Sequence, residues 1–198
     1  MSLVRHSPLL RLSCAGCVLA LLAACSSAPA PVAPTPPPPA PVVPPVQRAE
    51  AALAPASASL ISGRMVLLPV ADGVRITGTV GGLPPLRQFG FHVHERGDCS
   101  AVDASSAGAH FNPGATAHGR NGAGPHHAGD MDNLQSNADG VAQVDLRLPG
   151  VALGGGGPGD IVGRALVVHA DPDDYRSQPA GNSGARVACG VIRPLAGN

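Results

Sequence analysis

The sequence predicts an all-β protein whose strands form a sandwich or a barrel, and three observations support this fold class. The 198 residues include 26 glycines and 22 prolines, about twice the usual share, and these residues mark turns. Aromatic residues make up only 2% of the chain, although 44% is hydrophobic. From residue 60 onward, short runs of alternating polarity lie between Gly- and Pro-marked turns, as in half-buried strands. A helical bundle is therefore excluded.

Six strands can be assigned in order from these runs. We expect them at residues 63–69, 73–80, 88–94, 142–148, 163–169 and 185–192, with one further edge strand in the remainder. Between residues 97 and 134 the sequence has no periodicity. A structureless stretch of that length in a compact domain needs another source of order or a function. The glycine run at residues 154–157 is expected to be a flexible connection.

The first 59 residues are expected to be appendages. Residues 1–24 have the layout of a secretory signal peptide, because two arginines precede a short apolar stretch that ends in small residues. Cys25 follows Leu-Ala-Ala, which resembles the lipobox of bacterial lipoproteins and implies lipidation of this cysteine. Ten of the 18 residues at 28–45 are proline, so we expect residues 25–59 to be an extended tether. The folded domain is then predicted at residues 60–198.

This organisation predicts a place in the bacterial cell envelope, in the periplasm and anchored to a membrane by lipid. Ser26 after the cysteine favours the outer membrane, and ordinary signal cleavage with an incidental Cys25 is the alternative. The chain balances 13 arginines against 13 acidic residues and has no lysine. A nucleic-acid-binding face with a basic excess is therefore not supported.

The third expected strand carries two histidines side by side. Side chains two residues apart on a strand point the same way. Alternation therefore sends Phe89, Phe91 and Val93 to one face and His92 with His94 to the other. Paired imidazoles of this kind can share one metal ion, while two exposed polar residues on a half-buried strand are the alternative.

Imidazoles and carboxylates interleaved with glycine gather in the aperiodic stretch within 23 residues. They are His110, His118, His126, His127, Asp130 and Asp132. This ligand set suits zinc, and a closed four-ligand site supplies folding free energy to a segment without its own core. His169 adds an imidazole at the end of a predicted strand. We expect a metal centre, with adventitious binding by a solvated loop as the alternative. Spacing alone does not choose between His126 and His127.

Six motifs follow one another in the predicted domain. They are Gly90-Phe91-His92-Val93-His94-Glu95, Ala109-His110-Phe111-Asn112-Pro113, His118, His127 with Asp130, Leu166-Val167-Val168-His169, and Gly184-Ala185-Arg186-Val187-Ala188-Cys189-Gly190-Val191-Ile192. In this order they resemble the copper/zinc superoxide dismutase family. The resemblance implies an immunoglobulin-like fold, an eight-stranded Greek-key barrel or flattened sandwich with long metal-binding and active-site loops.

The resemblance also implies one copper and one zinc ion per subunit. The implied copper ligands are His92, His94, His110 and His169. The implied zinc ligands are His110, His118, His127 and Asp130, so that His110 bridges both metals. The family's step of 17 residues from the bridging histidine selects His127.

Two further residues acquire roles through the resemblance. Asp173 matches the carboxylate that hydrogen-bonds one ligand of each metal, here His92 and His118, with Asp171 as the competitor. Arg186 matches the cation beside the copper that attracts and orients superoxide, and an arginine stays charged throughout.

The implied function is superoxide dismutation, with His110 and Arg186 as catalytic residues and superoxide as the substrate. In the family mechanism one superoxide reduces Cu(II) and leaves as oxygen, while His110 releases copper and takes a proton. A second superoxide oxidises Cu(I) and leaves as hydrogen peroxide. The alternatives are a non-enzymatic periplasmic copper- and zinc-binding lipoprotein and a mononuclear zinc hydrolase. A homodimer is left open.

The cysteines agree with an exported domain. Cys14 and Cys17 would leave with the signal peptide and Cys25 would be acylated, so Cys99 and Cys189 remain as the one available pair. We expect a disulfide between them in an oxidising compartment.

Overall fold

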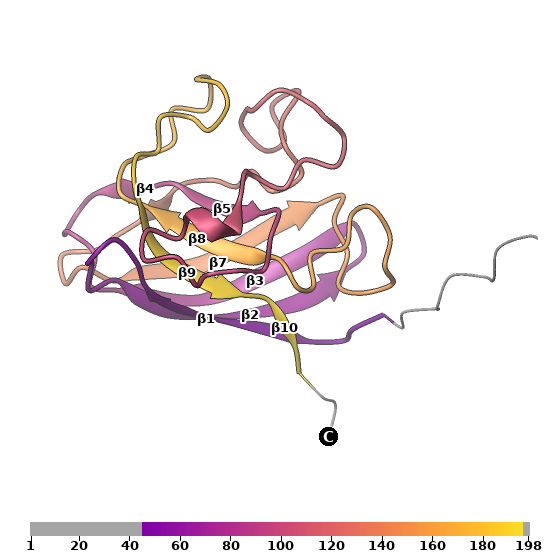
Figure 1. Ribbon diagram of the computed structural model, residues 1–198, viewed down its shortest axis with the longest axis horizontal. Coiled ribbons are helices and arrows are strands. Elements are labelled where there is room, and N and C mark those ends of the chain that lie inside the picture. The colour runs from indigo at the N-terminus through magenta and orange to yellow at the C-terminus, as the bar shows by residue number, and fades with distance from the viewer. Residues whose placement is uncertain (1–44, 196–198) are drawn as a thin grey trace, which may run out of the picture. The chain divides into compact units, whose positions relative to one another are not determined.

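The computed structural model describes residues 45–195, which form a curled antiparallel sheet and a short second ladder (Figure 1). The signal peptide, Cys25 and most of the predicted tether lie outside the described residues, so those expectations remain predictions. The strand order in the main sheet is β5-β8-β9-β1-β2-β3-β7, with β10 beside β1, and β4 pairs with β6. Strands from the two ends of the described chain therefore lie next to each other.

Ten strands make up these ladders. They are β1 (Ala49–Pro55), β2 (Ser62–Val70), β3 (Gly73–Gly81), β4 (Gln88–Phe89), β5 (Phe91–His94), β6 (Leu134–Gln135), β7 (Ala142–Pro149), β8 (Ala165–His169), β9 (Arg186–Val191) and β10 (Arg193–Pro194). The single helical element of the described residues is the 3-10 turn η1 (Ser105–Ala107). None of the helical structure described is long and apolar enough to cross a membrane. The predicted all-β fold class is confirmed.

Strands β2, β3 and β7 form an antiparallel meander whose sequence alternation matches its two faces. Met65, Leu67 and Ile76 are fully buried, whereas Arg64 and Arg75 are exposed. This is the period of two that a strand with one face on a core requires. The three strands expected here are confirmed to within one residue at each end.

The folded domain begins earlier than expected, because β1 belongs to the main sheet. The assignment of residues 49–59 to the tether was wrong: β1 pairs with β2 over Ala49 to Leu53 and with β9 at Ala54. Ala49, Ala51 and Leu53 are buried. Alanine has little preference for strands, so the local sequence gives a weak signal. The two neighbouring strands supply the hydrogen-bond partners that decide the conformation.

The sheet of β5, β8 and β9 has different residues on its two faces. Phe91 and Val93 pack into the main hydrophobic core, as does Leu166 on the neighbouring strand. His92 and His94 lie on the other face, as the alternation predicted. The strand expected at residues 88–94 is divided at Gly90, because β4 before it pairs with β6 and β5 after it pairs with β8.

A β-bulge brings two further functional residues to this second face. The pairing of β8 with β9 shifts between Val168 and His169, so that His169 lies opposite Arg186. Val187 and Ala188 consequently both pack into the core. Bulges re-aim side chains in this way next to active sites.

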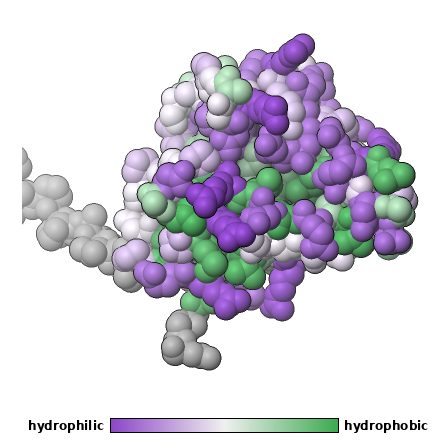
Figure 2. Space-filling view, turned by 180° about the vertical axis from the view of Figure 1, so that it is seen from behind, coloured by the Kyte–Doolittle hydropathy of each residue, from purple (hydrophilic) through white to green (hydrophobic). Residues whose placement is uncertain are grey.

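Two long loops rise on the same side of the sheet in Figure 1, one in pink and one in gold. We call residues 112–131 the ligand loop and residues 170–185 the rim loop. Their tips are mostly hydrophilic or neutral in the view of Figure 2, while green hydrophobic residues appear mainly in the body below them. The loops therefore have little apolar surface to bury, and their order must come from polar contacts.

Candidate metal centre

Four histidines converge at the second face of the sheet. His92 and His94 come from β5 and His169 from the end of β8, while His110 lies beside His94 in an isolated bridge. Each offers one ring nitrogen, and these four nitrogens lie within 4.8 Å of one another. All four side chains are buried, so their mutual positions are fixed by the surrounding structure.

The second nitrogen of each ring is held by the protein. His94 Nδ1 donates to the Gly108 carbonyl over 2.9 Å, which leaves His94 Nε2 at 3.3 Å from His169 Nε2. His92 Nε2 donates to an Asp173 oxygen over 2.8 Å. His92 Nδ1 and His110 Nε2 are buried and have no hydrogen-bond partner within the described residues. Buried polar atoms are otherwise nearly always satisfied. Converging unpartnered imidazole nitrogens therefore fit a metal ion.

A second group shares His110 with the first. His110, His118, His127 and Asp130 form it, and their ligand atoms also lie within 4.8 Å of one another. Asp130 Oδ1 is 2.8 Å from His110 Nδ1 and 3.3 Å from His127 Nδ1. Asp130 Oδ2 is 3.0 Å from His118 Nδ1, although that pair lacks the alignment of a hydrogen bond. Three nitrogens and one carboxylate around one point match the usual ligands of zinc.

Asp173 connects the two groups from behind. Its Oδ2 accepts from His92 and its Oδ1 accepts from His118 Nε2 over 2.9 Å. Asp171, the other candidate from the sequence, is exposed and lies 3.8 Å from Arg87. A carboxylate that holds one ring in each group fixes the tautomer and orientation of both.

Burial sets the protonation of the first group. It lowers the pKa of His92 to about 4, against the opposing hydrogen bond from Asp173. Burial likewise lowers the pKa of His94 to about 2 and that of His169 well below its usual value. These imidazoles are therefore neutral at pH 7 and keep the lone pair that a metal requires.

The second group is charged differently. Burial lowers the pKa of His118, but the close carboxylate of Asp130 and the hydrogen bond to Asp173 raise it to about 9. Burial raises the pKa of the Asp130 and Asp173 carboxyls, but contacts with His118, together with hydrogen bonds from His110 to Asp130 and from His92 to Asp173, hold it far below the usual range. A metal ion that binds His118 must therefore displace a proton.

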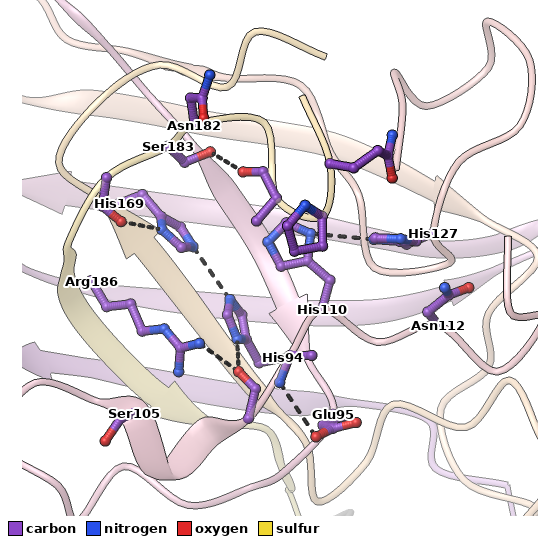
Figure 3. A pocket seen from close by; sticks show the side chains of 16 residues that line it. His94, Glu95, Ser105, His110, Asn112, His127, His169, Asn182, Ser183 and Arg186 are labelled. Atoms are coloured by element: carbon purple, nitrogen blue, oxygen red, sulfur yellow. Dashed lines mark hydrogen bonds between the residues drawn. The ribbon is translucent and has the colours of Figure 1, made fainter. Parts of the chain in front are cut away.

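A cleft of about 640 Å³ opens over the first group (Figure 3). His94, His110 and His169 line its floor, and Arg186 lies at its side. The Arg186 guanidinium donates to the carbonyls of Ala104 and Gly108 over 2.7 and 2.6 Å. Burial lowers the pKa of Arg186, and Asp103 opposes that shift. An arginine remains protonated under such shifts, so the cleft holds a fixed positive charge beside the histidines.

The disulfide positions the two carbonyls that hold Arg186. Cys99 and Cys189 are bonded, as expected, and close a separation of 90 residues. Cys189 lies on β9, so the bond fastens the segment that begins near Cys99 to the strand that carries Arg186. The predicted disulfide is therefore confirmed, and it lies close to the site.

Two residues of the predicted cluster lie outside both groups. His126 is half-buried and bonds the Gly124 carbonyl, and Asp132 pairs with Arg120. The sequence did not single out two side chains that support the site: Asn133, which makes two hydrogen bonds to the Asp173 backbone, and Gln178. Neither belongs to a motif with its own chemical signature.

The described geometry agrees with comparisons to known proteins. The family model "Copper/zinc superoxide dismutase (SODC)" matches residues 61–192. "Superoxide dismutase [Cu-Zn] 2" from Aquifex aeolicus is 44% identical over 137 residues, which cover 67% of this chain and 80% of that protein. "Superoxide dismutase-like protein YojM" from Bacillus subtilis is 40% identical over 124 residues, covering 61% of this chain and 63% of that protein. A crystal structure of a double mutant of a SOD-like protein from Bacillus subtilis has a TM-score of 0.67 at 37% identity, covering 73% of this chain and 96% of the other.

Fold and site together define a protein with a curled antiparallel β-sheet and two metal-binding groups joined by one histidine. The chain belongs to the copper/zinc superoxide dismutase family. Its cofactors are accordingly copper and zinc, its substrate is superoxide, and its enzyme class is superoxide dismutase.

Proposed function

We propose that the protein dismutates superoxide with copper in the first group and zinc in the second. On this assignment His92, His94, His110 and His169 hold copper, and His110, His118, His127 and Asp130 hold zinc. The observation that carries the proposal is the position of His110. Its Nδ1 faces Asp130 while its Nε2 has no partner among the described residues, and the ring lies at the floor of the cleft.

The residues around the cleft have separable tasks. Copper, when bound, would supply the one-electron oxidation and reduction of superoxide. Arg186 would attract the anion and orient it, because its guanidinium is held by two carbonyls and faces the cleft. His110 would hold and return a proton at Nε2, since Asp130 keeps the other side of its ring in place. Asp173 would keep His92 and His118 in the required orientation.

A non-enzymatic copper- and zinc-binding protein is the second candidate. One observation favours it: a relative that is 40% identical bears the name "superoxide dismutase-like". A binder needs the two groups of ligands but has no use for a fixed guanidinium beside them. Arg186 therefore separates the two candidates.

The deciding experiment compares Arg186→Ile with Arg147→Ile, which removes the same charge from an exposed position on β7. Arg186→Ile should leave copper and zinc contents and the visible spectrum nearly unchanged, because arginine is not a ligand. Its turnover should fall tenfold or more, since ~1.4 kcal/mol of lost interaction with the anion corresponds to a factor of ten. Its rate should also depend less steeply on salt up to ~0.15 M than the wild-type rate does. Full activity with an unchanged salt slope in Arg186→Ile would favour the binding protein.

The ligand assignment has its own test in metal analysis. His92→Ala should lose copper and retain zinc, because the His92 ring offers a ligand atom only to the first group. Asp130→Ala should lose zinc, because its carboxylate touches every histidine of the second group. Equal loss of both metals in both variants would contradict two distinguishable sites.

We also propose that the protein is a lipoprotein of the bacterial cell envelope. The support is the sequence layout before and at Cys25. Replacing Cys25 with alanine should move the protein and its activity from the membrane pellet to the soluble fraction, because alanine cannot carry the lipid chains. Stable anchoring needs more than one such chain. A variant that stays in the pellet would overturn this proposal.

A further inference from the structure

The rim loop reaches the second metal group through one side chain. Gln178 Oε1 accepts the backbone N–H of His118 over 2.9 Å, and Gln178 Nε2 donates to the His118 carbonyl over 2.9 Å. One amide thus satisfies both backbone groups of a residue whose ring belongs to the second group. The pairing resembles one rung of an antiparallel ladder, formed by a side chain in place of a strand.

The same residue also forms part of the cleft. Gln178 lines it together with the following residues Pro179, Ala180 and Asn182. In Figure 3 Asn182 lies at the top of the view and Arg186 lower down, with His169 between them. The side chain of Gln178 therefore links the His118 backbone to the rim of the cleft.

A second contact between the loops lies beside Tyr175. Its hydroxyl accepts the N–H of Asn133 over 2.9 Å, and the Arg120 guanidinium lies 5.3 Å from the centre of its ring. Arg120 is on the ligand loop and Tyr175 on the rim loop. Because Tyr175 is the sole tyrosine and the chain has no tryptophan, its fluorescence reports on this contact alone.

We propose that Gln178 is a positioning residue that couples metal binding in the second group to the rim of the cleft. The proposal rests on the assignment of zinc to that group. A ligated His118 ring fixes the His118 backbone, and Gln178 then holds residues 178–182 in place over the first group. The rim loop is tied together by hydrogen bonds among Asp174, Ser177 and Asn182, so residues 178–182 can follow Gln178 as one unit. Zinc thereby controls how easily an anion reaches copper.

The experiment uses the copper-only and copper–zinc forms of each protein. The variants are Gln178→Ala, which removes both bonds, and Gln178→Glu, which keeps the acceptor for the His118 N–H and loses the donor. Gln143→Ala on exposed β7 is the control. Azide binding to copper is measured by visible absorption, Tyr175 anisotropy by fluorescence, and zinc release by transfer to a chelator.

In the wild type, azide affinity and Tyr175 anisotropy should differ between the two forms, with azide affinity changing at least threefold. In Gln178→Ala both differences should shrink toward zero, and zinc release should be about tenfold faster, equivalent to ~1.4 kcal/mol. Gln178→Glu should fall between the two. Its added charge weakens azide binding in both forms alike, so the difference between forms remains the readout. Gln143→Ala should behave as the wild type.

The outcomes separate this inference from the function it rests on. A wild type that binds no zinc in the second group overturns the ligand assignment, and the inference with it. A wild type that binds zinc but shows no difference between the two forms overturns the coupling. A Gln178→Ala protein that keeps the wild-type difference in azide affinity overturns the role of Gln178, whatever its activity.

Discussion

Asp173→Asn should impair the first metal group more than the second, although Asp173 contacts one histidine in each. The carboxylate accepts three hydrogen bonds. Oδ1 accepts from His118 Nε2 over 2.9 Å and from the Tyr175 N–H over 2.7 Å, while Oδ2 accepts only from His92 over 2.8 Å. An asparagine has one oxygen and one NH₂ group. The asparagine oxygen should take the place of Oδ1, where it can accept from both donors, and the NH₂ group should face His92.

The NH₂ group forces His92 into the other tautomer. Its Nε2 must then accept, so its proton moves to Nδ1, the buried nitrogen that has no partner among the described residues. That nitrogen can no longer bind a metal without losing its proton. Removal of such a supporting group costs ~10–100-fold in metal affinity, and a lost hydrogen bond to a charged group costs ~1.5–3 kcal/mol. We expect the loss of affinity to be ~100-fold for copper and ~10-fold for zinc.

The measurement is chelator competition for each metal separately, with Asp171→Asn as the matched control. Asp171 is exposed and makes no contact with either group, so its variant should keep both affinities. A greater loss of zinc than of copper affinity in Asp173→Asn would refute the tautomer argument. An unchanged copper affinity would refute the support of His92 by Asp173 altogether.

Three further outcomes follow from the same geometry. Gly181→Ala should lower the affinity for both metals, because a Cβ there would clash with the Asp173 carboxylate and lie 2.8 Å from the His118 ring, and the backbone φ of +64° disfavours alanine; unchanged metal binding would contradict the packing. In the metal-free protein the pKa of His92, about 4, lies below the ordinary 6.5, so stability falls as pH drops from 6.5 through 4. The pKa of His118, about 9, lies above the ordinary 6.5. The stability that protonated His118 contributes is therefore fully present below pH 6.5 and is lost as pH rises through 9. The urea midpoint should therefore peak near pH 6.5, and a steady rise from pH 5 to 9 would contradict this. Reducing the disulfide should remove ~4–5 kcal/mol of stability and lower turnover while metals stay bound, because the carbonyls that hold Arg186 are released; equal activity of the two forms would exclude that link.

The strands with one face on the core could be read from the sequence. Met65 and Leu67 alternate with more exposed residues, and this period of two can be recognised without knowing which strands lie next to it. The strand at residues 49–55 could not be read in this way, because alanines that are buried in a sheet look like alanines in a linker. Its conformation depends on β2 and β9, which lie next to it only after folding.

The site divides along a similar line. His92 and His94 could be placed together because two residues on one strand face have a fixed relation. The partners of these rings could not, since the Gly108 carbonyl has no sequence signature and Asp171 and Asp173 differ only in how the rim loop folds. The role of Gln178 depends likewise on a loop conformation that its neighbours in sequence do not specify.

The origin of each ligand explains why two metals share one histidine. Three residues of the first group, His92, His94 and His169, lie on paired strands and are held with or without a metal. The second group draws its other ligands from the ligand loop, whose order depends on polar contacts. His110 lies at the junction, since it bridges to β5 beside His94 and also contacts Asp130. A ligand shared between a rigid sheet and a polar loop lets the strands define where the loop closes. It also makes the geometry of the first group sensitive to whether the second is filled.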